Sequence, residues 1–292
     1  MRLGCIDIGS NTTRLLVADC DGTGLAAVHQ ERVFTRIGHE VLDHGLVRPA
    51  KVAEVVAVVA GQLRTARALG VTEIHAVATE AIRRAANGAE LLDAVSAAAG
   101  VSVRVLTGEE EARLAFVGVA GTLSAAPAPG QAVGVADVGG GSSELVVGTP
   151  PRAIRWWVSV ALGSTDLTHA LLASDPPSAE QLAAARERVG SELAGLEPPQ
   201  VALGVAVGGS ATSLARIAGE RLDAPALRRA LELLVCAPAA VIASRHGIDP
   251  VRARLLPAGL LVLAGVAELF GTALRVGAGG IREGVLLEAA AR

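Results

Sequence analysis

Two short turns, rich in glycine and hydroxyl side chains, each follow an aspartate that ends an apolar segment. The first is Asp7-Ile-Gly-Ser-Asn-Thr12 and the second is Asp137-Val-Gly-Gly-Gly-Ser142. Glycine adopts backbone conformations that branched residues resist and lets a ligand approach the main chain closely. Successive amides and hydroxyls in such turns point into one concavity, which suits an anion. The sequence therefore predicts two phosphate-binding turns that face each other across a cleft between domains.

A third glycine turn, Gly208-Gly209-Ser210, ends an apolar segment at 201–207 and opens an expected helix at 211–218. A helix N-terminus is itself an anion site. No G-x-x-x-x-G-K-[ST] sequence is present, which excludes P-loop chemistry at motif level. The predicted phosphate-binding residues of the three turns are Asp7, Gly9, Ser10, Asn11, Thr12, Gly139, Gly140, Gly141, Ser142, Gly208, Gly209 and Ser210.

Acidic side chains near the turns could serve phosphoryl transfer, which needs charge neutralisation and an oriented nucleophile. Asp137 and Glu144 flank the second turn and could share a Mg²⁺, which favours oxygen ligands. The alternative is a turn aspartate beside a strand-surface glutamate. The run Glu109-Glu110-Glu111 offers a general base. From spacing alone, this run is better explained as a solvated helix start whose acids suit the helix dipole.

The elements that must position these turns form a weak internal repeat. Cys5-Ile-Asp7-Ile-Gly9 matches Val135-Ala-Asp137-Val-Gly139 at a constant offset of 130 residues, and Thr12 matches Ser142 at the same offset. Such self-similarity predicts two domains of one topology, with chance matching as the alternative. A cleft between two such domains is the default ligand site.

The expected elements support this division. Apolar segments predict strands at 3–8, 14–19, 73–78, 101–106, 132–138, 144–148, 154–160, 201–207 and 274–277, with one more ending near residue 29. Helical spacing and capping signals predict helices at 49–69, 89–99, 109–119, 178–196 and 211–218, and a last helix from about residue 281. Residues 122–131 are the linker candidate. The predicted domains are 1–125 and 126–292, with the last helix a candidate for packing back on the first domain.

Composition narrows the function classes. The 292 residues are enough for two domains, and 51% of them are hydrophobic. A net charge of -3 and the absence of tyrosine argue against a nucleic-acid partner. Lys51 is the single lysine beside 25 arginines, so a cationic contact to phosphate must come from arginine, a metal ion or backbone amides. The longest uncharged apolar run, 255–267, is too short to span a bilayer, so we expect a cytoplasmic protein without a membrane partner.

The chain resembles the exopolyphosphatase/guanosine pentaphosphate phosphatases of the actin–hexokinase–Hsp70 superfamily, from residue 3 to about residue 288. The order and spacing of its motifs agree with that family throughout. The motifs are DIGSNTTRLLV at 7–17, ATEAIR at 78–83 followed by Asn87, TGEEEAR at 107–113, DVGGGSSELVV at 137–147, VGGSATSLA at 207–215, LPAG at 256–259 and IREG at 281–284.

The resemblance implies an α/β fold of two actin-like (ribonuclease H-like) domains, with mixed sheets flanked by helices and the active site in the interdomain cleft. It implies hydrolysis of the terminal phosphate of inorganic polyphosphate, or of the 5′ γ-phosphate of the guanosine pentaphosphate pppGpp, with Mg²⁺, and a homodimer. By matching position, Glu111 would activate water, Asp137 and Glu144 would be the metal-associated acids, and Arg83 would hold the chain of phosphates. The length matches the short, two-domain form of the family.

Two departures from the family pattern leave alternatives open. Asp166 and His169 stand where the family usually has arginine and glutamate, and Arg254 stands where it usually has aspartate. We hypothesise that Asp166 and Arg254 form an inverted ion pair. If the usual arginine instead contacts substrate, Asp166 would repel it, which keeps open a catalytically weak or inactive sensor that binds polyphosphate or guanosine penta- or tetraphosphate. A sugar-kinase-like activity is disfavoured by the GEEEAR and IREG segments.

Overall fold

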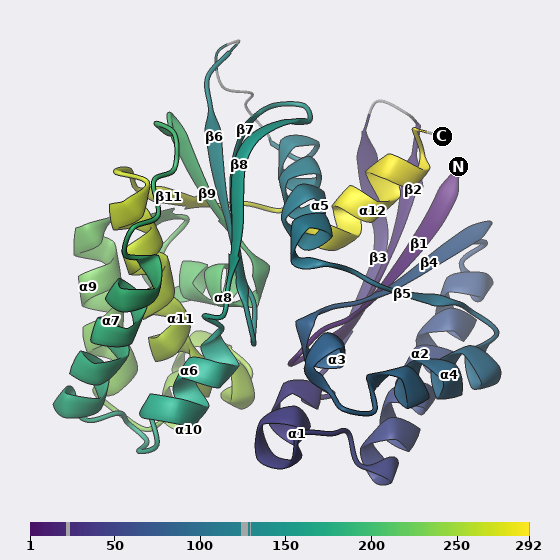
Figure 1. Ribbon diagram of the computed structural model, residues 1–292, viewed down its shortest axis with the longest axis horizontal. Coiled ribbons are helices and arrows are strands. Elements are labelled where there is room, and N and C mark those ends of the chain that lie inside the picture. Colours follow the sequence, from purple (N-terminus) through teal and green to yellow (C-terminus); the bar gives the residue numbers. More distant parts are fainter. Residues whose placement is uncertain (22–23, 124–127, 129, 292) are drawn as a thin grey trace. The chain divides into compact units, whose positions relative to one another are not determined.

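The computed structural model describes residues 1–21, 24–123, 128 and 130–291 (Figure 1). The chain divides into two compact units. The first unit contains Met1–Thr122 together with Gly279–Arg292, and the second contains Leu123–Ala278. The C-terminal segment thus belongs to the first unit. The predicted boundary between residues 125 and 126 lies outside the described residues.

The first unit is built on a mixed five-stranded sheet. Its strands are β1 (Arg2–Ile8), β2 (Thr13–Cys20), β3 (Leu25–Val33), β4 (Glu73–Ala78) and β5 (Val103–Val105), in the spatial order β3-β2-β1-β4-β5. The β1–β2 and β2–β3 pairs are antiparallel, whereas β1–β4 and β4–β5 are parallel. The glycine turn at Gly9 therefore joins two paired strands at the carboxyl end of β1.

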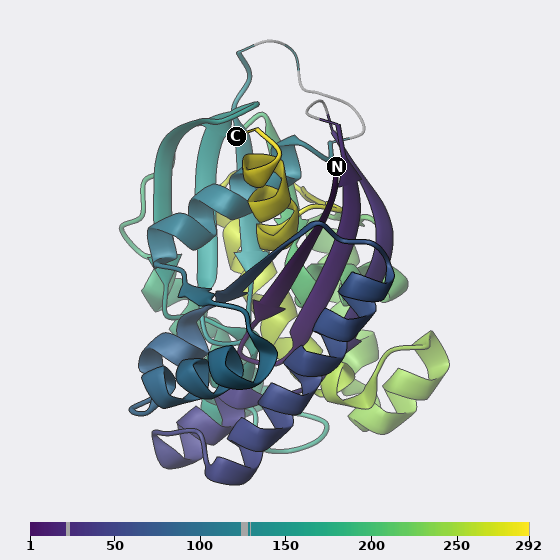
Figure 2. The ribbon, with the colours of Figure 1, turned by 90° about the vertical axis from the view of Figure 1, so that its right-hand side faces the viewer.

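Helices cover both faces of this sheet. The helices of the first unit are α1 (Ile37–His44), α2 (Pro49–Ala68), α3 (Glu80–Arg84), α4 (Gly88–Ala99), α5 (Gly108–Ala120) and α12 (Ile281–Ala289). Residues of α2 and α4 share one apolar core with Ile6 and Ile8, and Figure 2 shows α2 running beside the strands. Residues of α5 and α12 share the other core with Leu3 and Cys5. Because strand side chains alternate, Asp7 lies on the face that α5 and α12 cover.

The second unit repeats this topology and adds one edge strand. Its strands are β6 (Val133–Val138), β7 (Ser143–Thr149), β8 (Ala153–Val160), β9 (Leu203–Val207), β10 (Arg221–Leu222) and β11 (Leu274–Val276), in the order β10-β11-β9-β6-β7-β8. Again the central strand pairs antiparallel with its successor (β6–β7) and parallel with the strand beyond (β6–β9). The predicted repeat of two domains with one topology is confirmed.

The helices of the second unit pack around one large apolar core. They are α6 (Ser164–Leu171), α7 (Ala179–Leu193), α8 (Gly208–Ala218), α9 (Ala224–Val235), α10 (Ala239–His246) and α11 (Pro250–Leu269). Among the described residues, α11 is the one helix whose length and composition would allow it to cross a membrane, but 67% of its apolar stretch is buried inside the unit. It is accordingly the core helix of this unit.

The long elements match the sequence-based prediction, while several short ones do not appear in it. Helices α1, α3 and α6 have five to eight residues each, so they carry too little periodicity to be recognised. Helices α1 and α6 are hydrogen-bonded to the glycine turns, as described below. The predicted class, α/β units with mixed sheets flanked by helices, is confirmed.

Candidate functional site

The two predicted turns have the same geometry. The Gly9 amide donates to the Thr12 carbonyl oxygen at 3.0 Å, and the Gly139 amide donates to the Ser142 carbonyl oxygen at 3.0 Å. The hydroxyl-bearing side chains of both turns are at least nine-tenths buried. At Gly139, an added Cβ would lie 2.9 Å from the Ser142 carbonyl oxygen, so a side chain would force this turn open.

Buried polar atoms without hydrogen-bond partners gather at the first turn. Both side-chain polar atoms of Asn11 are buried and make no hydrogen bond within the described residues, and the same holds for Asp7 Oδ1. Burial raises the pKa of the Asp7 carboxyl, against the lowering effect of the nearby Arg14 and Arg282 guanidinium groups. Native proteins rarely leave such groups unsatisfied, so they mark a place where a polar ligand completes the hydrogen bonding.

The segment from Arg36 to Gly38 is hydrogen-bonded to the backbone of the first turn. The Arg36 amide donates to the Asn11 carbonyl oxygen at 3.1 Å, and the Gly38 amide donates to the Ser10 carbonyl oxygen at 2.7 Å. An added Cβ at Gly38 would lie 3.1 Å from Ser10 Cβ. These bonds occupy the carbonyl groups of the turn, which leaves its amides and side chains as the groups that can meet an anion.

Glu111 lies in the first turn of α5 on the side that faces the unit's interior. Thr107 and Glu110 form a capping box that fixes where this helix starts. Glu111 is 3% exposed, and Arg83 of α3 donates from Nη1 both to Glu111 Oε1 and to the Leu106 carbonyl oxygen. Sequence reasoning assigned Arg83 to substrate, whereas the structure pairs it with the predicted base. The pairing fixes the orientation of the Glu111 carboxylate, which a proton acceptor requires.

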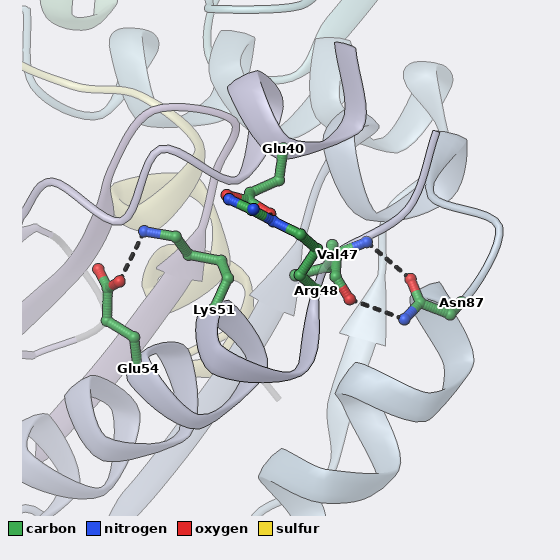
Figure 3. Close-up of polar contacts among 6 residues, drawn as sticks. All are labelled: Glu40, Val47, Arg48, Lys51, Glu54 and Asn87. Atoms are coloured by element: carbon green, nitrogen blue, oxygen red, sulfur yellow. Dashed lines mark hydrogen bonds and ion pairs between the residues drawn. The ribbon is translucent and has the colours of Figure 1, made fainter. Parts of the chain in front are cut away.

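Asn87 anchors the short helix that carries Arg83. Its Oδ1 accepts from the Val47 amide at 2.8 Å, and its Nδ2 donates to the Val47 carbonyl oxygen at 2.9 Å (Figure 3). Asn87 precedes α4 at the N-cap position but makes no side-chain bond to that helix. Its amide instead ties the end of α3 to the connection between α1 and α2. A helix of five residues needs such anchors, because it is not stable alone.

Replacing Asn87 by alanine is expected to destabilise the protein by about 1–3 kcal/mol, because Val47 is buried and its backbone groups would lose their partners. We also expect a fall in kcat without a matching rise in KM, since α3 would hold Arg83 and Glu111 less firmly. Urea unfolding and steady-state kinetics measure the two effects. Glu40→Gln is the control, because it loosens the same α1–α2 connection without touching α3; an equal kcat loss in that variant would remove the specific role of Asn87.

That connection is held on its other side by an ion pair. Arg48 binds Glu40 through two parallel hydrogen bonds of 2.8 Å, while Lys51 pairs with Glu54 at 2.6 Å (Figure 3). The hydrogen bonds from Arg48 lower the pKa of Glu40 to about 2. A carboxylate whose pKa is lower in the folded state stabilises the fold above its unfolded pKa, and this stabilisation is lost as pH falls toward the folded pKa.

The lowered pKa of Glu40 therefore predicts how the stability contributed by its carboxylate changes with pH. Wild type should be more stable than Glu40→Gln near neutral pH, and the difference should shrink as pH falls from about 4.5 toward about 2. Chemical denaturation of both proteins over this range measures the difference. A gap that stays constant with pH would mean that the carboxylate charge does not stabilise this connection.

In the second unit, α6 holds the glycine turn. The Ser164 amide donates to the Gly139 carbonyl oxygen at 2.9 Å, and the Thr165 amide donates to the Gly140 carbonyl oxygen at 2.8 Å. Gly163 passes so close that an added Cβ would overlap the Gly140 carbonyl group and the Gly141 nitrogen. The Thr165 hydroxyl is buried and makes no hydrogen bond within the described residues, as at Asn11. Sequence reasoning assigned no role to Gly163 or Thr165.

The third glycine turn lies beside one acidic and one basic side chain, Asp137 and Arg252. Gly208 has a φ of 84°, and an added Cβ there would lie 2.5 Å from Asp137 Oδ1. An added Cβ at Gly209 would lie 2.6 Å from Cζ of Arg252, a residue of α11 that is 5% exposed. A buried arginine beside a glycine turn at a helix start is suited to bind phosphate. Arg252 has no recognisable spacing to the turn, so sequence reasoning did not assign it to the site.

The predicted metal acids lie directly opposite each other. Asp137 pairs with Glu144 across β6 and β7, which places both side chains on one face of the sheet. Glu144 is 2% exposed, and its Oε1 accepts from Ser159 Oγ at 2.8 Å. No group of three or more His, Cys, Asp or Glu suited to a metal occurs in the described part of the chain. Two carboxylates fit Mg²⁺, which commonly takes one or two of them together with water and substrate phosphate.

The structure gives Arg254 and Ser210 surroundings that differ from those expected from the sequence. Arg254 donates through Nη2 to the carbonyl oxygens of Leu172 and Ala173, at the C-terminal end of α6, so the structure gives it other partners than the hypothesised Asp166. A cation at a helix C-terminus is stabilising. Ser210 is fully buried, and an added Cβ at Gly259 would lie 2.5 Å from its Oγ. Its side chain therefore packs against α11, and its hydroxyl makes no hydrogen bond within the described residues.

The structure thus assembles two clusters, one in each unit. In the first unit Arg36–Gly38 is hydrogen-bonded to the Asp7 turn, and Arg83 is paired with Glu111. In the second, α6 is hydrogen-bonded to the Asp137 turn, Gly208 lies beside Asp137, and Arg252 of α11 lies beside Gly209. The prediction that the two turns face each other across a cleft stays a prediction.

Comparison with known proteins identifies relatives of the whole chain. The Ppx/GppA phosphatase family matches residues 16–292. An uncharacterized protein of Streptomyces coelicolor is 34% identical over 98% of this chain and 90% of its own length, and exopolyphosphatase 1 of Mycobacterium tuberculosis is 30% identical over 98% and 88%. The solved structure of the Aquifex aeolicus Ppx/GppA family member is similar with a TM-score of 0.83, at 30% identity over 99% of this chain and 97% of that one. These relatives confirm the predicted α/β fold, which this chain shares with a solved member of the Ppx/GppA family.

Proposed function

Because the chain belongs to the Ppx/GppA phosphatase family, we propose that it hydrolyses the terminal phosphoanhydride bond of inorganic polyphosphate or of the guanosine pentaphosphate pppGpp. The family supports a phosphatase that acts on polyphosphate or a related substrate. The choice of the terminal bond, the use of Mg²⁺ and the role of Glu111 are our proposals.

One observation carries the proposal: buried polar groups without partners occur at the glycine turns of both units. They are the Asn11 amide, Asp7 Oδ1 and the Thr165 hydroxyl. A protein that used these turns only to connect strands would be expected to satisfy such groups internally. In each unit, backbone amides and hydroxyls of the turn lie beside these groups, and in the second unit Arg252 lies beside Gly209. Such groups make an environment for phosphate oxygens.

The residues then have distinct roles. The amides of Gly139–Ser142 bind the terminal phosphate, and Arg252 with the start of α8 neutralises its charge. Glu111, oriented by Arg83, accepts a proton from the attacking water. Asp137 and Glu144 would hold Mg²⁺, which when bound neutralises negative charge on the phosphate oxygens.

Water and the phosphoanhydride substrate are the two reactants of this hydrolysis. The water oxygen forms a bond to the terminal phosphorus while the bond from that phosphorus to the bridging oxygen breaks. Glu111 takes the proton that water loses. The products are inorganic phosphate and a chain, or nucleotide, that is shorter by one phosphate. Phosphoryl transfer of this kind depends mainly on positioning and charge stabilisation, which these groups supply.

A substrate panel tests the proposal. Phosphate release from long-chain polyphosphate, pppGpp and ATP is measured with Mg²⁺ and with a chelator. We expect metal-dependent release from polyphosphate or pppGpp and far slower release from ATP. Tight binding of these substrates without release would reject hydrolysis in favour of a sensor that binds them.

A further inference from the structure

We propose that Arg32 and Arg36 form a binding site for inner phosphates of a polyphosphate chain that passes the first glycine turn. The inference rests on the proposed function for its substrate class. It concerns residues that neither the motifs nor the comparisons assign, and it is carried by three features at one end of the first sheet.

The first feature is a pair of like charges. Arg32 of β3 lies directly opposite Arg14 of β2, and Arg14 lies directly opposite Asp7 of β1. Directly opposed residues of adjacent strands place their side chains on the same face, so these three form one row across the sheet. Asp7 is the cross-strand neighbour of Arg14, whereas Arg32 on the edge strand β3 has another arginine as its cross-strand neighbour. Like charges in this arrangement oppose sheet pairing unless an anion joins them.

The second feature is the absence of an acid at the end of this row. Neither Arg32 nor Arg36 forms an ion pair with a carboxylate within the described residues, and both are exposed. The guanidinium carbon of Arg32 lies 5.1 Å from the centre of the Phe34 ring, a cation–π contact that orients the group but leaves its N–H donors available. The adjacent acid on β3, Glu31, points to the opposite face of the sheet because side chains alternate.

The third feature is backbone strain at Arg36. This residue has a φ of 52° and a ψ of 39°, the one non-glycine residue with positive φ in the described part of the chain. Glycine or asparagine would adopt this conformation more readily than arginine. The conformation lets the Arg36 amide bond to the Asn11 carbonyl oxygen, so the strained residue is attached to the phosphate-binding turn itself. Strain of this kind is concentrated at ligand-binding positions.

Together these features place two arginines at one end of the first sheet, one of them bonded through its backbone to the Ser10–Thr12 turn, in a chain of net charge -3. A guanidinium group binds phosphate through two parallel hydrogen bonds and keeps its charge at every physiological pH. A polyphosphate chain offers successive phosphates that such a pair can bind beyond the one at the turn. The pair would thus favour long chains over short ones.

The test uses Arg32→Gln, Arg36→Asn and the double variant. Asparagine at position 36 tolerates positive φ, so it removes the charge while retaining the backbone. Arg64→Gln with Arg67→Gln is the matched control, because it removes two exposed charges from α2 on the opposite face of the same sheet. The dissociation constant of long-chain polyphosphate is measured by calorimetry at low and high salt, alongside KM and kcat for long-chain polyphosphate, tripolyphosphate and pppGpp.

We expect the double variant to weaken long-chain binding by about tenfold or more at low salt, with a smaller salt dependence. Tripolyphosphate should be affected much less. Unchanged long-chain binding, equal weakening in the control, or weakening confined to pppGpp would each overturn the inference. Because binding is measured directly, a wild type that binds polyphosphate but releases no phosphate would reject the proposed function while leaving this test intact.

Discussion

Replacing Glu111 by glutamine is expected to lower kcat for phosphate release by about 10²–10⁴-fold, with substrate affinity nearly unchanged. Glutamine has the shape of glutamate and still accepts a hydrogen bond from Arg83, but its amide does not accept a proton from water. The residue is 3% exposed. Because the capping box of Thr107 and Glu110 fixes the start of α5, the substitution is not expected to shift the helix. Steady-state kinetics, with polyphosphate binding measured separately, test both parts.

Glu109→Gln is the matched control for this experiment. Glu109 lies in the same first turn of α5 and has the same favourable relation to the helix dipole, but it is exposed. We expect its variant to keep activity close to that of wild type. If Glu111→Gln loses no more activity than Glu109→Gln, Glu111 is not the proton acceptor, and the acidic run is the solvated helix start that spacing alone favours.

Replacing Gly163 by alanine is expected to reduce kcat by about 10²-fold or more, because it moves the groups that bind the terminal phosphate. The backbone of Gly163 is extended, so the substitution causes no strain in its own conformation. The added methyl group would instead overlap the Gly140 carbonyl and the Gly141 nitrogen. The turn must then move away, and overpacking of this kind also costs about 1–3 kcal/mol of stability.

Gly190→Ala separates this effect from a general response to a lost glycine. Gly190 lies in α7 of the same unit, is exposed, and has no atom within 4 Å of an added Cβ. Alanine there should raise stability by about 0.5–1 kcal/mol and leave kcat unchanged. Kinetics and thermal unfolding of both variants give the comparison. Full activity in Gly163→Ala would show that the Gly139–Ser142 turn does not need its observed position.

Much of the fold was predictable from the sequence because its main elements are long or strongly patterned. Strands such as β1 and β6 are short apolar runs that end at an Asp-x-Gly turn, and α2 has twenty residues between clear boundaries. The repeat at an offset of 130 residues reappears as the same turn hydrogen bond, Gly9 to Thr12 and Gly139 to Ser142. The residue types within each turn were therefore sufficient to predict that the two turns are alike.

The supporting residues were not predictable, since they depend on contacts between segments distant in sequence. Gly163 meets Gly140 only because α6 folds back on the turn, and Arg252 reaches Gly209 from another helix. Arg83 appeared in a recognisable motif, but spacing gave no sign that its partner would be Glu111. The charge exchange at Asp166 and Arg254 likewise did not reveal that Arg254 reaches the backbone at the end of α6.

The central claim is that water attacks the terminal phosphorus of the substrate. Hydrolysis of polyphosphate in water enriched in ¹⁸O, followed by mass spectrometry of the products, tests it most directly. We predict that each released phosphate carries one solvent oxygen and that the shortened chain carries none. Phosphate without label, label in the remaining chain, or no release at all would contradict the account.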